Sequence, residues 1–152
     1  MPQGMTIFAV TNAVVDAIVA DVTTAWNPKK IYVGPPELVE ESQTLPVAFV
    51  MLTGAEPNEE YSTLTTEAFD LSFEIVLRAT KPGKGEGDTS RRKRASVEAL
   101  RMRLTAGATY HGFNREWGGE TYLDDAVREQ EAAAGWCQVT CRFTVTVETS
   151  AK

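Results

Sequence analysis

Residues 67–79 (EAFDLSFEIVLRA) alternate between apolar and polar side chains, and this is the most regular pattern in the 152-residue chain. The apolar positions are Phe69, Leu71, Phe73, Ile75 and Leu77, the polar positions are Asp70, Ser72, Glu74 and Arg78, and Val76 departs from the alternation. Because successive side chains of a strand point to opposite faces, the pattern predicts a strand with one buried and one solvated face. The apolar face of such a strand must be covered by a second layer of structure.

Three further segments are predicted to be strands. Residues 137–148 alternate in the same way, and their inward positions are Cys137, Val139, Cys141, Phe143, Val145 and Val147. Residues 45–52 (LPVAFVML) are apolar throughout, which suits a strand that is covered on both faces. A shorter run, residues 31–33 (IYV), precedes it in the chain.

Two segments have the spacing of amphipathic helices. In residues 11–26 the apolar positions are Val15, Ile18, Val19, Val22 and Trp26, with Thr11 or Asn12 as the expected cap and Pro28 as the stop. In the second helix the apolar positions are Val97, Leu100 and Leu104, with Asp88, Thr89 or Ser90 as the expected cap and Gly107 as the stop. Helices segregated from hairpin-connected strands predict one α+β domain, residues 1–152, with an antiparallel sheet packed by two helices.

Two segments are less regular. Residues 53–64 (TGAEPNEEYSTL) have the composition of a turn with exposed carboxylates. Residues 121–135 (TYLDDAVREQEAAAG) have a helical composition, but residues 122–131 also suit a polar strand paired with the last one. The residues alone leave both interpretations open.

A basic segment, residues 81–94 (KPGKGEGDTSRRKR), contrasts with the acidic remainder of the chain. It holds six of the fifteen lysines and arginines and two carboxylates, so its charge of +4 leaves −10 for the rest of a chain whose total is −6. Its glycines and like charges predict a flexible loop at about 80–90, after which Arg91–Arg94 begin the second helix. A phosphate-loop interpretation fails, because GKGEG lacks the Walker spacing and its closing Lys-Ser/Thr pair.

Three uses of the basic segment remain open: a contact between subunits, nucleic-acid binding, and a solvated face. Cations are unfavourable at a helix N-terminus, so carboxylates of a neighbouring copy would compensate them. The candidate subunit-interface residues are Lys81, Lys84, Arg91, Arg92, Lys93 and Arg94 on the basic side and Glu59, Glu60, Asp124 and Asp125 on the acidic side.

Few residues have the chemistry that catalysis or metal binding needs. The chain has one histidine, His111, in a turn-like TYHGFN context, so no histidine-based triad or metal cluster is expected. Cys137 and Cys141 would lie about 13 Å apart on one face of a strand, beyond disulfide reach. We therefore expect no enzyme activity, no cofactor and no metal site, and we expect neither a membrane span nor a signal peptide.

The order of these elements resembles that of phage tail terminator proteins, the minor tail protein U type, also called tail completion or head–tail joining proteins. The resemblance runs from about Val10 to Glu148 and rests on a first helix ending in AW, then LPVAFVML, FDLSFEIVLRA, ASVEALRMRL and CQVTCRFTVTVE. It implies that residues 121–131 form a strand. No functional side chain of the family transfers to a position of this sequence.

The resemblance implies a structural protein of the virion, located at the head-proximal end of the tail after synthesis in the host cytoplasm. Such proteins form a ring, typically hexameric, that caps the tail tube, stops its polymerisation and presents a surface to the neck proteins of the filled head. The implied partners are further copies of the chain, the tail tube protein and a neck or head-completion protein. DNA only passes through the channel, which an acidic protein favours.

Two alternatives remain at this stage. One is another neck or head–tail connector component with a small α+β fold. The other is a small binding domain, unrelated to phages, that uses residues 81–94 for nucleic acid or for an acidic ligand.

Overall fold

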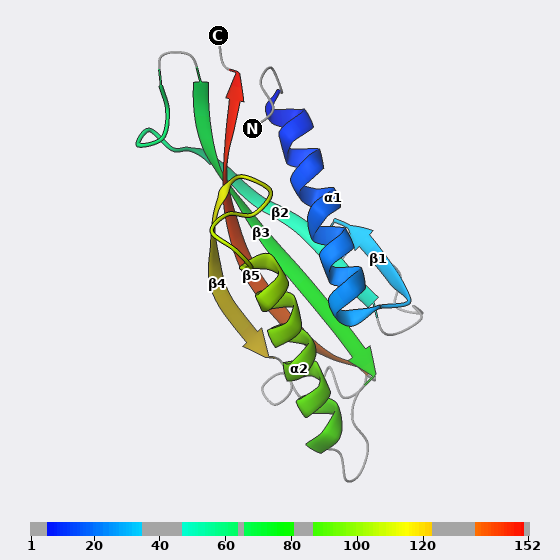
Figure 1. Ribbon diagram of the computed structural model, residues 1–152. Helices are drawn as coiled ribbons and strands as arrows, with labels where there is room; N and C mark the ends of the chain where they lie inside the picture. Colours follow the sequence, from blue (N-terminus) through cyan, green and yellow to red (C-terminus); the bar gives the residue numbers. More distant parts are fainter. Residues whose placement is uncertain (1–5, 35–46, 64–65, 81–86, 123–135, 151–152) are drawn as a thin grey trace.

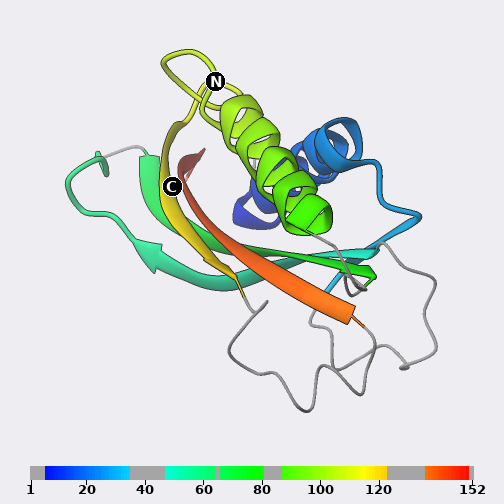
Figure 2. The same ribbon diagram turned by 90° about the horizontal axis from the view of Figure 1, so that it is seen from below.

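The computed structural model describes residues 6–34, 47–63, 66–80, 87–122 and 136–150 (Figure 1). Its elements are α1 (Ile7–Trp26), β1 (Lys30–Val33), β2 (Val47–Pro57), β3 (Thr66–Thr80), α2 (Gly87–Leu104), β4 (Asn114–Tyr122) and β5 (Trp136–Ser150). Both helices lie on one face of a five-stranded sheet of order β1-β2-β3-β5-β4 (Figures 1 and 2). The predicted α+β class, with two helices packed on a sheet, is confirmed.

The sheet is antiparallel except at one edge. β3 and β5 pair over their full lengths, from Thr66 opposite Ser150 to Thr80 opposite Trp136. β2 and β4 pair antiparallel to the outer sides of these two strands. β1, however, runs parallel to β2, so the expectation of an entirely antiparallel sheet is wrong at this edge.

Two strand boundaries differ from those predicted. β2 continues to Pro57, so its last residues are strand where a turn was expected; pairing with the fifteen-residue β3 extends β2 past its apolar run. The penultimate strand, implied at residues 121–131, is β4 at 114–122, and residues 123–135 lie outside the described part of the chain. β4 is not recognisable in the sequence because a bulge interrupts its alternation of apolar and polar residues. The register with β5 shifts between Trp117 and Glu120.

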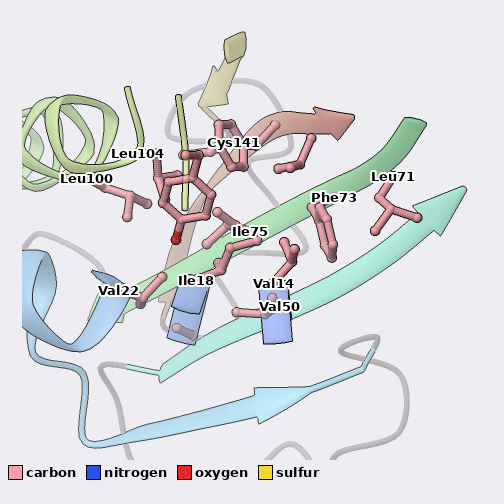
Figure 3. Packing of buried hydrophobic residues seen from close by; sticks show 14 of the residues in the cluster. Val14, Ile18, Val22, Val50, Leu71, Phe73, Ile75, Leu100, Leu104 and Cys141 are labelled. Atoms are coloured by element: carbon pink, nitrogen blue, oxygen red, sulfur yellow. The ribbon is translucent and has the colours of Figure 1, made fainter. Parts of the chain in front are cut away.

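The core lies between the helices and the sheet. α1 contributes Val10, Val14, Ile18 and Val22, α2 contributes Val97, Leu100 and Leu104, β3 contributes Leu71, Phe73, Ile75 and Leu77, and β5 contributes Val139, Cys141, Phe143, Val145 and Val147. Figure 3 shows side chains of both helices and of β3 in the space between the two layers. The predicted inward faces of β3 and β5 are confirmed at these positions, although Phe69 is half-buried.

A second, smaller cluster lies on the opposite face of the sheet. Val47, Phe49 and Val76 are buried there, and Tyr32 stacks on Phe49 with ring centroids 5.6 Å apart. The Arg78 guanidinium lies over the Phe49 ring, 5.2 Å from its centroid. This cluster explains why the start of β2 is apolar on both faces and why Val76 departs from the alternation of β3.

α1 begins earlier than predicted. Thr6, not Thr11 or Asn12, caps it, because the buried stripe extends back to Val10 and the Ala9 amide donates to the Thr6 hydroxyl oxygen (3.1 Å). It ends at Asn27, a left-handed residue with φ 52°, directly before the predicted stop at Pro28. By length and composition this helix would suffice to cross a membrane, which the sequence reasoning did not expect, but the core helix of a water-soluble domain passes the same test.

α2 also differs at both ends. It begins at Gly87, before the expected caps at 88–90, and it ends at Leu104 rather than at Gly107. Arg115 of β4 closes the C-terminal end: its guanidinium donates to the carbonyl oxygens of Leu104 (3.3 Å) and Ala108 (3.3 Å) and to those of Thr105 and Gly107. One cation of the next strand thus binds the last carbonyl of α2 and three carbonyls of the loop that follows the helix.

Candidate assembly surfaces

The β2–β3 hairpin extends past β1, whereas β5 stays paired with β3 along its whole length (Figure 1). β1 pairs with β2 only along residues 47–50, and a hydrogen bond from Gly34 N to Val50 O (3.0 Å) follows the last pair. In the described part of the chain, no strand borders the outer edge of β2 from Met51 to Pro57. We call residues 51–63 together with 66–71 the arm.

The turn of the arm is held by its own polar groups. Asn58 N donates to Ala68 O (2.8 Å), and the Ser62 hydroxyl donates to Asn58 O (2.8 Å) while accepting from Ala68 N (3.0 Å). The hydroxyl oxygens of Thr63 and Thr66 lie 2.8 Å apart in a further hydrogen bond. Bonds of this kind let the backbone turn without a regular ladder, so the turn is preorganised.

Asp70 ties the turn to the centre of the sheet. One of its carboxylate oxygens, Oδ1, accepts from Asn58 Nδ2 (3.0 Å) and from the Thr146 hydroxyl of β5 (2.7 Å). Asp70 is half-buried, so these bonds also satisfy a group that has partly lost its water. The predicted polar face of β3 therefore has a structural function at this position.

One face of the arm is an exposed apolar strip. Leu52 lies opposite Phe73, Ala55 opposite Leu71 and Pro57 opposite Phe69. Directly opposite residues share a face, so these three residues of β2 continue the face that the helices cover elsewhere. Leu52 is 45% exposed, and Ala55 and Pro57 are also exposed. We call Leu52, Ala55 and Pro57 the arm strip.

Carboxylates border the arm strip. Residues 53–67 contain four glutamates and no lysine or arginine, and Glu56, Glu59, Glu60 and Glu67 are all exposed. None of the four forms an ion pair with a residue that the structure describes. The arm thus combines an apolar face with glutamates in the same segment of the chain, although Glu56, which pairs with Asp70, lies on the face opposite the arm strip.

A second exposed apolar surface lies on the outer face of α2. Ala95, Ala99 and Met102 follow the i, i+4, i+7 spacing of one helix face, away from the buried Val97 and Leu100. Met102 is 63% exposed and Ala95 is exposed. We call Ala95, Ala99 and Met102 the α2 stripe.

Cations flank the α2 stripe in the sequence. Arg91, Arg92, Lys93 and Arg94 belong to α2 and precede Ala95 directly. They are its fifth to eighth residues rather than its start as predicted, because α2 already begins at Gly87, within the segment that was expected to be a loop. Farther along the helix, Arg101 pairs with Glu98 (2.6 Å) and Arg103 pairs with Asp21 of α1 (3.2 Å). The exposed Arg101 lowers the pKa of the Glu98 carboxyl by donating a hydrogen bond to it.

The candidate interface residues are separated in space. Glu59 and Glu60 lie in the turn of the arm, whereas α2 begins at the opposite end of the molecule (Figure 1). The remaining candidates, Lys81, Lys84, Asp124 and Asp125, lie outside the described residues. Within one subunit the acidic turn and the basic start of α2 are therefore not brought together.

A shallow hollow of about 300 Å³ is lined by Asp21, Met102, Arg103 and Ala106. Both carboxylate oxygens of Asp21 are engaged, because Tyr110 donates its hydroxyl to Oδ2 (2.6 Å) and Arg103 Nε donates to Oδ1 (3.2 Å). Burial, and then the hydrogen bond to Asp21, raises the pKa of the Tyr110 phenol well above its usual range. The three groups fasten α1 to α2 and to the loop before β4.

His111 and the cysteines have structural surroundings. His111 is exposed in the predicted turn, with φ 51°, and its ring meets Tyr110 edge-on at 4.5 Å. Cys141 is buried, and burial raises the pKa of its thiol to about 12, with the charge of Glu120 adding to the effect. Cys137 lies in β5, but its side chain is outside the described residues. Among the described residues, no group of three potential metal ligands is assembled.

The sequence reasoning missed the arm strip. Its residues lie in a segment with glycine and proline that predicted a turn, and β2 was expected to end at Leu52. No local pattern reveals it, because the length of β2 is set by its pairing with β3.

Comparison with known proteins gives a structural match and no sequence match. No family model matches the chain, and no curated protein sequence matches it. The fold is similar to a chain in the cryo-EM structure of an extracellular contractile injection system, the PVC sheath/tube terminator in the extended state. The TM-score is 0.63 at 12% sequence identity, and the match covers 99% of this chain and 58% of that chain, which is less than two thirds of it. The fold of this chain is therefore a tail-terminator-like fold.

Proposed function

We propose that the protein is a tail terminator: a homo-oligomeric ring, typically hexameric, that caps the head-proximal end of a tail tube and stops its polymerisation. The observation that carries the proposal is the fold similarity to a sheath/tube terminator over 99% of the chain. The proposed partners are further copies of the chain, the tail tube protein and a neck or head-completion protein. Its place would be the tail of the particle.

The described surfaces fit a structural role better than a catalytic one. Asp21, the carboxylate at the hollow, is occupied by Tyr110 and Arg103, and Cys141 is buried as a neutral thiol. The arm strip and the α2 stripe, in contrast, expose apolar side chains that a partner can cover. The proposal is therefore one of assembly, without an enzymatic step.

The charge of the chain suits a channel for DNA. A net charge of −6 repels phosphates, so a ring of such subunits lets DNA pass without holding it. The exception is the basic segment, and its use between subunits would remove most of its charge from the channel surface.

A second candidate function extends the first. The similar protein is a terminator of both sheath and tube, so this chain is also a candidate for contact with a contractile sheath. Sheath subunits and tube subunits, offered separately to the purified protein, distinguish the two forms of the proposal.

Tube growth tests the proposed function directly. Purified tube protein is allowed to polymerise with and without this protein, and tube lengths and tube ends are measured by negative-stain electron microscopy. We expect shorter tubes with a ring at one end, and native mass spectrometry should give an integral number of copies. Tubes of unchanged length with bare ends would contradict the proposal.

A further inference from the structure

We propose that the arm of one subunit docks on the α2 stripe of a second copy, so that the subunits join head to tail. This inference adds the contact surface to the proposed ring and rests on that proposed function for the closure of the ring. The arm strip would cover Ala95, Ala99 and Met102 of the next copy, and the glutamates of the arm would lie against the cations in the first half of α2.

The first argument is the fit of the two surfaces. The arm presents Leu52, Ala55 and Pro57, and α2 presents two alanines beside one flexible methionine, which allows close approach and adaptable packing. The two surfaces are apolar and belong to segments of opposite charge, which is the composition of a specific contact.

The second argument is the balance of charge. Residues 53–67 carry four negative charges and no positive charge, and residues 81–94 carry a net +4. The first half of α2 contains four consecutive cations, which are the fifth to eighth residues of the helix. Arg91 and Arg94 are spaced i, i+3, so their like charges repel each other. Carboxylates brought by a neighbour offset that repulsion, and the exposed glutamates of the arm are one source of them.

The third argument is placement. The arm and the start of α2 lie at opposite ends of the subunit, so the complementary surfaces cannot meet within one chain (Figure 1). Two different surfaces that complement each other make a heterologous contact, which closes into a ring when the rotation per subunit allows it.

Docking through side chains, rather than by strand addition, follows from the edge of β2. The register shifts between Leu52 and Gly54, and Pro57 has no amide hydrogen to donate. A bulge and a proline both blunt an exposed edge against pairing with another strand. The apolar face of the arm and its glutamates remain as the contact surface.

Charge reversal tests the contact. The first variant carries Glu59→Lys and Glu60→Lys, and the second carries Arg91→Glu and Arg92→Glu. Each should weaken self-association at least about tenfold in analytical ultracentrifugation, since like charges then face each other. Both changes should leave the monomer folded, because Glu59 and Glu60 are exposed and because arginine and glutamate have similar helix propensities.

A mixture of the two variants gives the decisive test. In an equimolar mixture, the basic arm of the first variant can dock on the acidic α2 of the second, and the unaltered arm of the second can dock on the unaltered α2 of the first. Assembly should therefore return, with the two variants alternating and present in equal numbers. The matched control is Asp16→Lys with Glu116→Lys, which reverses two exposed carboxylates outside both surfaces and should leave assembly unchanged.

The outcomes separate this inference from the proposed function. If the unaltered protein forms rings that both variants also form, or if the control weakens assembly as much as the variants do, the docking surface is wrong. Defective variants that the mixture fails to rescue contradict it as well. If rings form and respond as expected but never bind tail tubes, the docking surface stands and the terminator function falls. If single subunits cap tubes, the capping of tubes is supported and the proposed docking surface is contradicted.

Discussion

At the scale of single residues, several side chains join one element of the fold to another. Arg115 of β4 binds carbonyls at the end of α2, Asp70 joins the arm to β5, and Asp21 of α1 accepts from both Arg103 and Tyr110. Each of these groups satisfies backbone or hydroxyl partners that would otherwise be left without a bond in a partly buried place. Their effect should therefore appear in stability.

Arg115→Met should lower the free energy of unfolding by about 2–4 kcal/mol, because several carbonyls lose a charged donor at once. Denaturant unfolding followed by circular dichroism measures this change. Arg142→Met is the control: its guanidinium donates to the Thr121 hydroxyl (2.9 Å) and is exposed, so the loss should stay below about 1 kcal/mol. Equal losses of unfolding free energy in the two variants would contradict the larger contribution assigned to Arg115.

Cys141 gives a prediction for alkaline pH. The pKa of its thiol is about 12 in the folded protein, against an ordinary value of 9.0. Above pH 9 the unfolded chain releases this proton and the folded chain keeps it, so stability is full below pH 9 and falls as the pH rises towards 12. As the pH rises above 9, the unaltered protein should lose up to about 1.4 kcal/mol of unfolding free energy per pH unit relative to Cys141→Ala. Parallel pH profiles of the two proteins would contradict the burial of this thiol.

At the scale of elements, each strand has a distinct relation to its neighbours. β3 and β5 are long, fully paired and alternating, and their predicted faces agree with the structure because one face meets the helices and the other does not. β4 and the end of β2 lie at edges, where bulges interrupt the pairing. In β4 the bulge contains Gly119, with φ 93°, a conformation that residues other than glycine adopt only with strain.

The central face of β3 is testable at Phe73, which is 1% exposed. Phe73→Ala should cost about 3–5 kcal/mol, the usual loss for a buried phenylalanine and the cavity that it leaves. Thermal and denaturant unfolding measure the change. Phe8→Ala serves as the control, because Phe8 is 74% exposed on α1 and its removal should change stability by less than about 0.5 kcal/mol. An unchanged unfolding midpoint for Phe73→Ala would show that this face of β3 is not the buried one.

At the scale of the whole molecule, charge is distributed unevenly. The acidic arm and the basic start of α2 lie at opposite ends, and the sum of all charges is −6 (Figure 1). Such a distribution favours association of copies in one orientation and opposes binding of DNA by the body of the protein.

Replacing Arg91, Arg92, Lys93 and Arg94 together by glutamine should weaken assembly and leave the stability of the monomer unchanged. Stability should hold because these residues follow the first turn of α2, outside the reach of the helix dipole, and because glutamine has about the same helix propensity as lysine and arginine. Light scattering and thermal unfolding of the same samples measure the two effects, and a gel-shift titration at two salt concentrations measures DNA binding. If assembly persists and a salt-sensitive DNA complex disappears, the basic segment is a nucleic-acid contact instead.

The sequence by itself determined the layers of this protein. The alternation in β3 and β5 is a local pattern, and so is the helical stripe that ends in Leu104. Each pattern gathers the apolar side chains on one face, and that face is buried when the elements pack together. The tertiary structure alone decided the rest. The parallel β1, the length of β2 and the contact of Arg115 with the end of α2 depend on how one element packs against another, and no local pattern specifies that partner. The arm strip is exposed for the same reason: its residues are apolar like the core, and only the end of β1 at Val33 and the position of the helices leave them uncovered.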